Sequence, residues 1–524
     1  MQTGSFVIRK ATAFLLWLNY FFEYSLIYKG LQAIANASKS SRIANEFLQT
    51  ERDYWQGSFI LRFFSFIVGG IFSCVGWIFI KLKKLNENSL NRKIVLYLAG
   101  ILRQARNDGF WSRTFFECVP VRLAIWFFDL KKVYMLFIAV TLVVPSTMWN
   151  NRYLFLSAVF FAGIYALKWF LTDSENIKPK FSQLSPALLL FVFFCAFSII
   201  TGYGGADSLR VFIIFFACVI HSVLVVLIFN KLEDFKLFFI FIAAALVIAA
   251  LFGFYQFAAG IEIRAELVDL SSNPGLSRLY SSMGNPNNDA QVWAMFLPFL
   301  IAACITVKCD IKRLTLAGVI LLVLAAFAMT YSRAGYIAFI AGMGVFVLLA
   351  APRLIPVALL ALIFALPFVP AGIIERMLTL GSDTSSSYRF LIWGGVLNML
   401  EDFWVRGIGM GPDAFIRIYR GYAHPLAERA MHSHNMFFDL VTHSGIGALL
   451  AFLAYLFGLL KRGVSAHVNS SDKEYKIFMS AGIAALTVFV ALGIGEYVWF
   501  YPRVMLVFWI IAGLVCAMAK VEKT

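Results

Sequence analysis

Long apolar runs dominate this chain and decide what it can fold into. Its 524 residues are 61% hydrophobic and only 14% charged, with a mean hydropathy of +0.79. Ordinary soluble domains carry about 25% charged residues. A membrane-spanning helix needs roughly 20 apolar residues, and about fourteen runs approach that length here. The sequence therefore predicts an all-α polytopic membrane protein with about 12–14 transmembrane helices.

The predicted spans follow one another along the whole chain. The first is interrupted by Asn19, Tyr20 and Glu23, so an alternative is a helix that lies in the membrane interface. No small-residue cleavage site follows this run, so we expect no cleavable signal peptide. The predicted spans lie near 11–31, 57–81, 133–148, 152–171, 187–203, 209–229, 236–258, 289–307, 314–331, 335–351, 354–373, 435–460, 477–495 and 502–519.

Most lysines lie on alternate connections between these spans. By the positive-inside rule that side is the cytoplasm, which also places both termini inside. The most basic connection, 82–132, has apolar residues between its charges, which suits helices lying on anionic inner-leaflet lipid. The net charge of +16 is thus an orientation signal, and we expect membrane lipids, and no nucleic acid, as partners. The other lysine-bearing connections are 178–180, 231–236, 308–313, 461–462 and 520–523.

The connections on the opposite face select arginine over lysine. The segments 204–208, 259–288, 332–334, 374–434 and 496–501 contain no lysine. Arginine binds phosphate and carboxylate groups through a planar fork, whereas lysine is a hydrated point charge. We therefore expect this face to bind an anion such as a lipid diphosphate, the alternative being that topology alone disfavours lysine there. The longest of these connections, 374–434, carries Arg376, Arg389, Arg406, Arg417, Arg420 and Arg429.

Three of the six histidines fall within twelve residues, where this long connection enters the next apolar run. They are His432, His434 and His443, in the stretch Met431–Gly447. Histidine titrates near neutrality and serves as a general base when it is held at a water-facing site. The alternative is that all three are interfacial polar residues at the start of a helix.

Several short motifs on the same face follow a recognisable order. They are Asn285-Pro286-Asn287 after Arg278, Ser332-Arg333-Ala334-Gly335, Arg389 through Trp393 at the start of a predicted amphipathic helix, Gly407-Ile-Gly-Met-Gly411 after Arg406, and His434-Asn435 followed by Gly445. This series resembles the O-antigen ligase and O-antigen polymerase superfamily, which are bacterial membrane glycosyltransferases of the GT-C type. The resemblance covers roughly residues 235 to 460. Ligases carry Gly, Thr or Tyr at the position of Ala448, and this departure leaves ligase and polymerase both open.

The resemblance implies a domain organisation and a place in the cell. Residues 1–132 form an N-terminal membrane extension with a basic cytoplasmic amphipathic region. Residues 133–524 form the ligase- or polymerase-like membrane domain, with the large extracytoplasmic helical loop 374–434. The protein is then a multi-pass protein of the bacterial cytoplasmic membrane with an extracytoplasmic active site.

The resemblance also implies an activity, which is transfer of a glycan from an undecaprenyl-diphosphate carrier to an acceptor sugar on lipid A core or on a lipid-linked glycan. No metal, nucleotide sugar or other cofactor is expected. His434 is the candidate base, and Asp383, Glu401 and Asp402 are weaker alternatives. Arg389 and Arg333 are expected to stabilise the leaving diphosphate. The expected substrate-binding residues are Arg278, Asn287, His432, Asn435 and Arg406, and Asn435, His432 and Asp439 are expected to orient His434.

Two other classes of function compete with this one. A lipid-linked oligosaccharide flippase would also use arginines for a diphosphate, but it should carry charge inside its spans, whereas the runs from 289 to 373 are nearly charge-free between their ends. A membrane sensor or scaffold without chemistry would not depend on His434 or Arg389.

Overall fold

The fold is known from a computed structural model. It describes residues 129–171, 185–261, 278–352, 371–378 and 384–521, together with isolated positions between 77 and 118 and between 355 and 363. The predicted spans 11–31, 57–81 and most of 354–373 lie outside these residues, as does most of the basic connection 82–132. The described part is all helical and contains no strand, so the predicted all-α class is confirmed.

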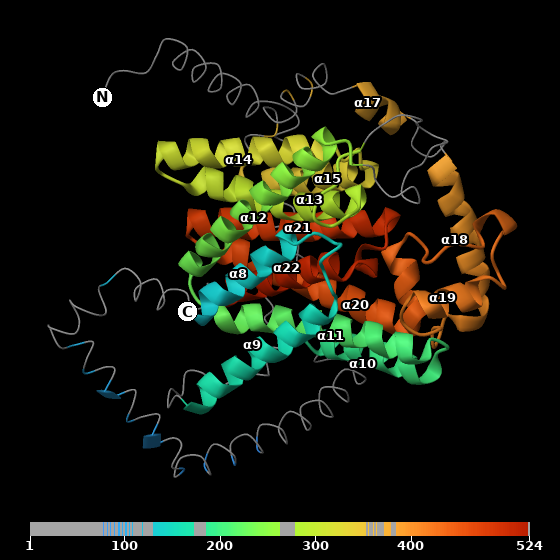
Figure 1. Ribbon diagram of the computed structural model, residues 1–524, viewed down its shortest axis with the longest axis horizontal. Helices are drawn as coiled ribbons and strands as arrows, with labels where there is room; N and C mark the ends of the chain where they lie inside the picture. Colours follow the sequence, from blue (N-terminus) through green and yellow to red (C-terminus); the bar gives the residue numbers. More distant parts are fainter. Residues whose placement is uncertain are drawn as a thin grey trace, which may run out of the picture.

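Eleven helices coincide with predicted spans and run side by side as one bundle (Figure 1). Eight of them are long and apolar enough to cross a membrane, and α10 is shorter, with 16 residues. The helices are α8 (Leu130–Val143), α9 (Arg152–Leu171), α10 (Pro186–Thr201), α11 (Gly205–Ile228), α12 (Leu232–Ala258), α13 (Pro286–Thr306), α14 (Asp310–Ala328), α15 (Arg333–Ala350), α20 (Met436–Asn469), α21 (Lys473–Gly495) and α22 (Pro502–Val521).

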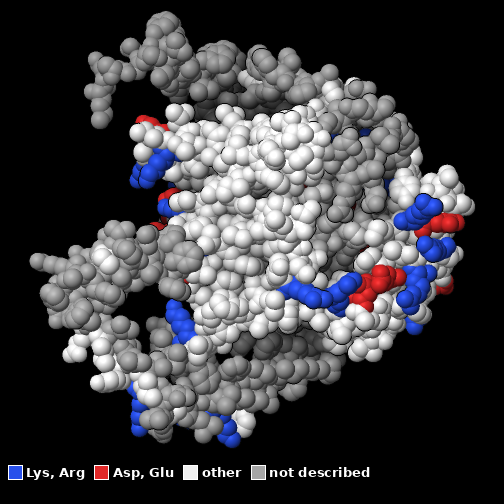
Figure 2. Space-filling view, in the orientation of Figure 1, with Lys and Arg blue, Asp and Glu red and all other residues white. Residues whose placement is uncertain are grey.

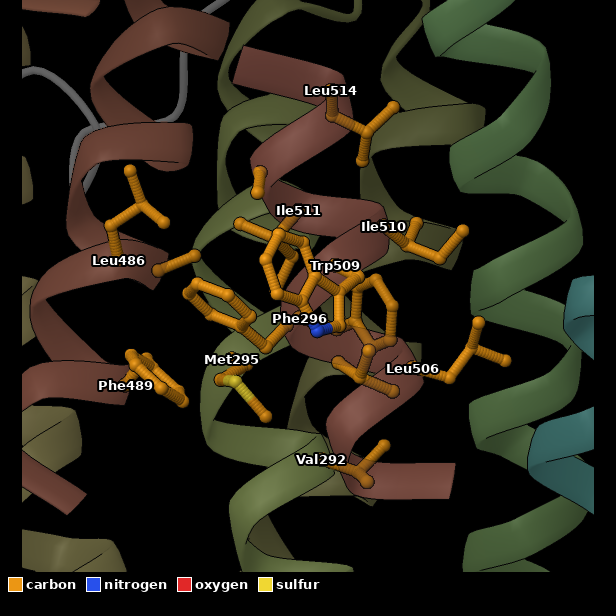
Figure 3. Close-up of a cluster of buried hydrophobic side chains, with 14 of the residues drawn as sticks. Val292, Met295, Phe296, Leu486, Phe489, Leu506, Trp509, Ile510, Ile511 and Leu514 are labelled. Atoms are coloured by element: carbon orange, nitrogen blue, oxygen red, sulfur yellow. The ribbon is translucent and has the colours of Figure 1, made fainter. Parts of the chain in front are cut away.

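The centre of the bundle is formed by α13, α21 and α22, which are buried over most of their length. Their side chains interlock around Phe296, Phe489 and Trp509 (Figure 3). In contrast, α14 and α15 are mostly exposed on their outer surfaces. The site described below is built on the ends of the central helices, which are the most firmly packed part of the bundle.

The two faces of the bundle are the ones that the lysine pattern predicts. On the lysine-bearing face, Lys131 contacts Asp234 at 2.7 Å and Lys236 contacts Glu474 at 2.8 Å. On the opposite face, the N–H of Leu279 donates to the carbonyl of Met329 at 2.8 Å. Most of the charged side chains visible in Figure 2 lie toward the ends of the bundle, which leaves a broad uncharged band between them.

The arginine-bearing face is also held by a buried arginine. Arg503, in the first turn of α22, donates to the carbonyls of Thr141 at 3.2 Å, Val144 at 2.5 Å and Ser282 at 2.7 Å. Its guanidinium also stacks over the Trp149 ring. One side chain thus ties the end of α8 and the segment before α13 to the start of α22.

The long connection 374–434 is a small helical unit with a hydrophobic core of its own. It contains α18 (Thr384–Phe403), α19 (Pro412–Tyr419) and the short 3-10 helix η8 (Pro425–Ala427), and α17 (Ala371–Leu378) precedes them. Ile392, Val396 and Met399 of α18 are buried in one cluster with Phe415 and Tyr419 of α19. In Figure 1, α18 runs across the ends of the spanning helices rather than alongside them.

Glycines join this unit to the bundle. Helix α20 breaks at Gly445, where φ is 79° and ψ is 170°. The break frees carbonyls of the preceding turn, so Thr442 accepts from the Ile408 N–H at 2.7 Å and His443 accepts from the Gly409 N–H at 3.0 Å. A Cβ at Gly407 would lie 2.4 Å from the carbonyl oxygen of His443. The glycine-rich motif therefore serves close backbone contact, which the missing side chain of glycine permits.

Candidate functional site

A single carboxylate organises the end of the bundle on the arginine-bearing face. Glu496 directly follows α21, and its side chain is 10% exposed. Its Oε1 accepts from Arg389 Nη2 at 2.5 Å and from Asn287 Nδ2 at 3.4 Å. Its Oε2 lies 3.5 Å from His434 Nδ1. Residues from α18, α13 and the segment before α20 thus converge on one side chain.

Glu496 is ionised despite its burial. Burial by itself raises the pKa of a carboxyl group. Here the charge of Arg389 and the hydrogen bond from His434 outweigh that effect, and the pKa of Glu496 is lowered to about 2. The group is therefore a permanent hydrogen-bond acceptor at neutral pH.

The backbone around His434 is held in an unusual conformation. His434 has a φ of 53°, which is uncommon for a residue other than glycine. The neighbouring Ser433 donates its hydroxyl to Asp439 at 2.7 Å and accepts from Trp393 Nε1 at 2.9 Å through its carbonyl. Asn435 caps α20 and donates to the carbonyl of Ile494 at 2.9 Å. These contacts hold the backbone of His434 and so determine the orientation of its side chain.

His432 packs directly against His434. The backbone N–H of His434 donates to His432 Nδ1 at 3.1 Å, and the two ring centroids are 4.1 Å apart. The other side of His432 faces the ring of Phe500, with centroids 4.4 Å apart. Burial, followed by the proximity of His434, holds the pKa of His432 well below its usual value. His432 is therefore neutral, with Nδ1 as acceptor.

Arg278 extends the network toward α15. Its Nη2 donates to Asn287 Oδ1 at 2.7 Å and its Nε donates to the Thr330 carbonyl at 2.8 Å. Asn287 in turn contacts Glu496, so the arginine is connected to the carboxylate through one amide. Arg333 is the first residue of α15, capped by Ser332, and lies three residues beyond Thr330.

Arg406 lies in a different environment from these residues. Its Nη2 donates to the Tyr203 hydroxyl at 2.7 Å, and its guanidinium lies over the Tyr203 and Phe403 rings. Tyr203 follows α10, and its N–H donates to the Ile408 carbonyl at 2.6 Å. These contacts place Arg406 where the helical unit joins the bundle, among aromatic rings rather than beside Glu496.

The other predicted acidic groups are also placed apart from the His434 ring. Asp439 accepts from the N–H and hydroxyl of Ser433, so it holds the backbone before His434 rather than its imidazole. Asp402 accepts from the Tyr422 hydroxyl, and Glu401 is exposed. Asp383 lies outside the described residues. Within the described ranges, no three His, Cys, Asp or Glu side chains gather as a metal site requires.

The sequence alone does not single out Glu496. It lies in the short connection 496–501, which the sequence distinguishes only by its lack of lysine. The available signal was an ionisable residue at the very end of an apolar span, which is a place where charge often has a function. Its three partners lie 209, 107 and 62 positions away in the chain, so only the tertiary fold reveals the cluster.

Comparison with known proteins supports the family that the motifs suggest. Residues 318–453 match a family model described as O-antigen ligase. The matched segment contains Arg333, Arg389 and the 432–435 stretch, whereas Glu496 lies beyond it. No curated protein matches the chain. The matched segment, carried on an all-helical bundle of membrane-spanning length, supports the assignment of this protein to the O-antigen ligase superfamily, whose members are glycosyltransferase-like enzymes.

Proposed function

We propose that the protein transfers an oligo- or polysaccharide from an undecaprenyl-diphosphate carrier to a sugar hydroxyl, at the outer face of the bacterial cytoplasmic membrane. The observation that carries this proposal is the convergence of His434 and Arg389 on one buried, ionised carboxylate at the arginine-bearing end of the bundle, to which Asn287 also connects Arg278. In this proposal residues 133–524 form the transferase domain, and residues 1–132 form an N-terminal extension.

The reaction requires the protein to stabilise the leaving diphosphate and to deprotonate the acceptor hydroxyl. The acceptor oxygen forms a bond to the anomeric carbon, and the bond from that carbon to the diphosphate oxygen breaks. The diphosphate leaves with the bonding electrons, so negative charge grows on it. Fixed positive charge near a low-dielectric surface stabilises such a leaving group. Arg389 and Arg333 are the proposed stabilising residues, and Arg278 and Asn287 extend the same polar surface.

The acceptor hydroxyl must also lose its proton, and His434 is the proposed base. Its side chain is 30% exposed, which leaves the imidazole accessible to a substrate. General bases of this kind contribute about 10² to 10⁴ in rate. His432 and Asn435 shape the surroundings of the ring through the contacts described above. No step in this scheme draws on a metal or a nucleotide.

The test uses purified protein in detergent with an undecaprenyl-diphosphate-linked oligosaccharide as donor. Lipid A core and a second lipid-linked oligosaccharide are offered as rival acceptors. Transfer to lipid A core identifies a ligase. A ladder of longer lipid-linked glycans identifies a polymerase, which is the alternative that the sequence leaves open.

Two matched pairs of variants connect the products to the site. His434→Ala and Arg389→Ala are expected to lower kcat by about 10² or more. His424→Ala and Arg420→Ala replace exposed residues of the same helical unit and should retain activity. If neither product forms while labelled donor crosses a liposome bilayer, the protein is a transporter and the proposal is wrong.

A further inference from the structure

The two oxygens of Glu496 have separate partners. Oε1 accepts from Arg389 and Asn287, and Oε2 faces Nδ1 of His434. Arg389 and Asn287 therefore set the rotation of the carboxylate, and the remaining oxygen is directed at the imidazole. This division is what a carboxylate that orients a histidine requires.

An ionised carboxylate can only accept a hydrogen bond. The contact to Glu496 Oε2 therefore requires a proton on Nδ1 of His434. A neutral imidazole carries one proton, so Nε2 then holds the lone pair. Catalytic hydrogen bonds are often long in the absence of substrate, and the 3.5 Å separation is of that kind.

We infer that Glu496 is a positioning residue that keeps His434 in the tautomer with a free Nε2, the tautomer that accepts the proton of the acceptor hydroxyl. This inference rests on the proposed function. When Nε2 takes the proton, the acceptor oxygen keeps the electron pair for the new glycosidic bond. The imidazolium that results stands beside the negative charge of Glu496, which stabilises it. Carboxylates in Ser-His-Asp triads act on their histidine in the same way.

The other groups around His434 do not compete for this role. His432 uses Nδ1 to accept from the His434 backbone, and its lowered pKa keeps it neutral. Asp439 is engaged by Ser433. Arg389 and Asn287 act on Oε1. Of the contacts described around the ring, only the one from Glu496 sets which nitrogen carries the proton.

Replacement of Glu496 by glutamine gives a specific expectation. Arg389 and Asn287 both donate, so they select the amide oxygen of the new side chain. The amide NH₂ then faces Nδ1 of His434 and donates to it, which moves the imidazole proton to Nε2 and blocks the base. Glu496→Gln should therefore invert the tautomer of His434 and lower kcat by about 10² to 10⁴.

The first measurement is ¹⁵N NMR on full-length protein labelled at histidine, with the His434 signals assigned by their loss in His434→Ala. The native chain should show a protonated Nδ1 and Glu496→Gln a protonated Nε2. A purely structural role for Glu496 would not exchange the two nitrogens. Glu428→Gln, an exposed change on the same helical unit, should leave the tautomer and the rate unchanged. A protonated Nε2 in the native chain overturns the inference.

The second measurement is a double-mutant cycle on the transfer rate. If Glu496 acts through His434, the double variant should be no slower than His434→Ala alone. Additive losses would show that Glu496 acts by another route and would overturn the inference. Glu496→Asp keeps the negative charge and should keep the original tautomer of His434. Its transfer rate therefore tests the inference if Glu496→Gln does not fold.

The two proposals fail in different ways. If His434→Ala transfers glycan at the native rate, the proposed role of His434 is wrong, whatever its tautomer. If His434→Ala is inactive while Glu496→Gln keeps the native rate and tautomer, only the role of Glu496 is wrong.

Discussion

Replacing Gly445 by alanine should detach the helical unit from the bundle. The residue interrupts α20 with a φ of 79° and a ψ of 170°, a region that is essentially restricted to glycine. A Cβ there would lie 2.1 Å from the carbonyl oxygen of Val405. Because the obstacle is backbone rather than a flexible side chain, relief requires that the two segments move apart.

The expected loss follows from the contacts at this junction. The backbone conformation alone costs an alanine about 1–3 kcal/mol. Separation also weakens the hydrogen bonds from Ile446 N–H to Trp404 O at 2.7 Å, from Ile408 N–H to Thr442 O and from Gly409 N–H to His443 O. Each is worth about 1 kcal/mol, so the free energy of unfolding should fall by about 4–6 kcal/mol in total if all three are lost.

Thermal unfolding of the purified protein in detergent, followed by tryptophan fluorescence, measures this loss. Gly458→Ala is the matched control, since it lies in the same helix with nothing within 4 Å of its added Cβ. Helix propensity makes the control neutral or up to about 1 kcal/mol more stable. Transfer activity should fall with Gly445→Ala, because Arg389 depends on the helical unit for its position. Equal stability of the two variants would refute the role given to the break in α20.

Two further outcomes are expected. The folded-state pKa of Glu496 is lowered from 4.5 to about 2, so its contribution to stability is complete above about pH 4.5 and is lost as the pH falls toward 2. Thermal unfolding midpoints measured between pH 7 and pH 3 should therefore fall more for the native chain than for Glu496→Gln. Parallel curves for the two proteins would contradict this expectation. Arg503→Met leaves the carbonyls of Thr141, Val144 and Ser282 without their buried donor. The free energy of unfolding should therefore fall by about 3–5 kcal/mol. A change below about 1 kcal/mol would show that water or other donors replace the guanidinium.

Much of the fold was predictable because a bilayer imposes strong rules. Apolar length locates a spanning helix, and the lysine distribution sorts connections onto two faces. Both predictions hold for the described helices, as the contacts of Lys131 and Lys236 on one face illustrate. The internal core of the 374–434 unit could not be predicted to the same degree, since it depends on how Ile392 of α18 meets Phe415 of α19.

The site was predictable only in part. His434, Arg389, Asn287 and Arg278 were expected on one face, and the structure joins them through Glu496. The alternation of spans assigns Glu496 to the same face, but it does not say which helices are neighbours, so sequence alone does not connect this glutamate with the other residues. Arg406 belongs to the same face by sequence, but its contacts with aromatic rings separate it from that group.

The position of Glu496, after the family-matched segment, bears on how the protein is made. Helices emerge from the ribosome in order, and the segment that matches the family ends at residue 453. At that stage of synthesis His434, Arg389 and Arg278 are present, but their shared carboxylate is not. Glu496 and Arg503 enter the bundle only when the hairpin of α21 and α22 is inserted. If the proposed function holds, a nascent chain is expected to stay inert toward lipid-linked sugars until α21 and α22 have entered the membrane.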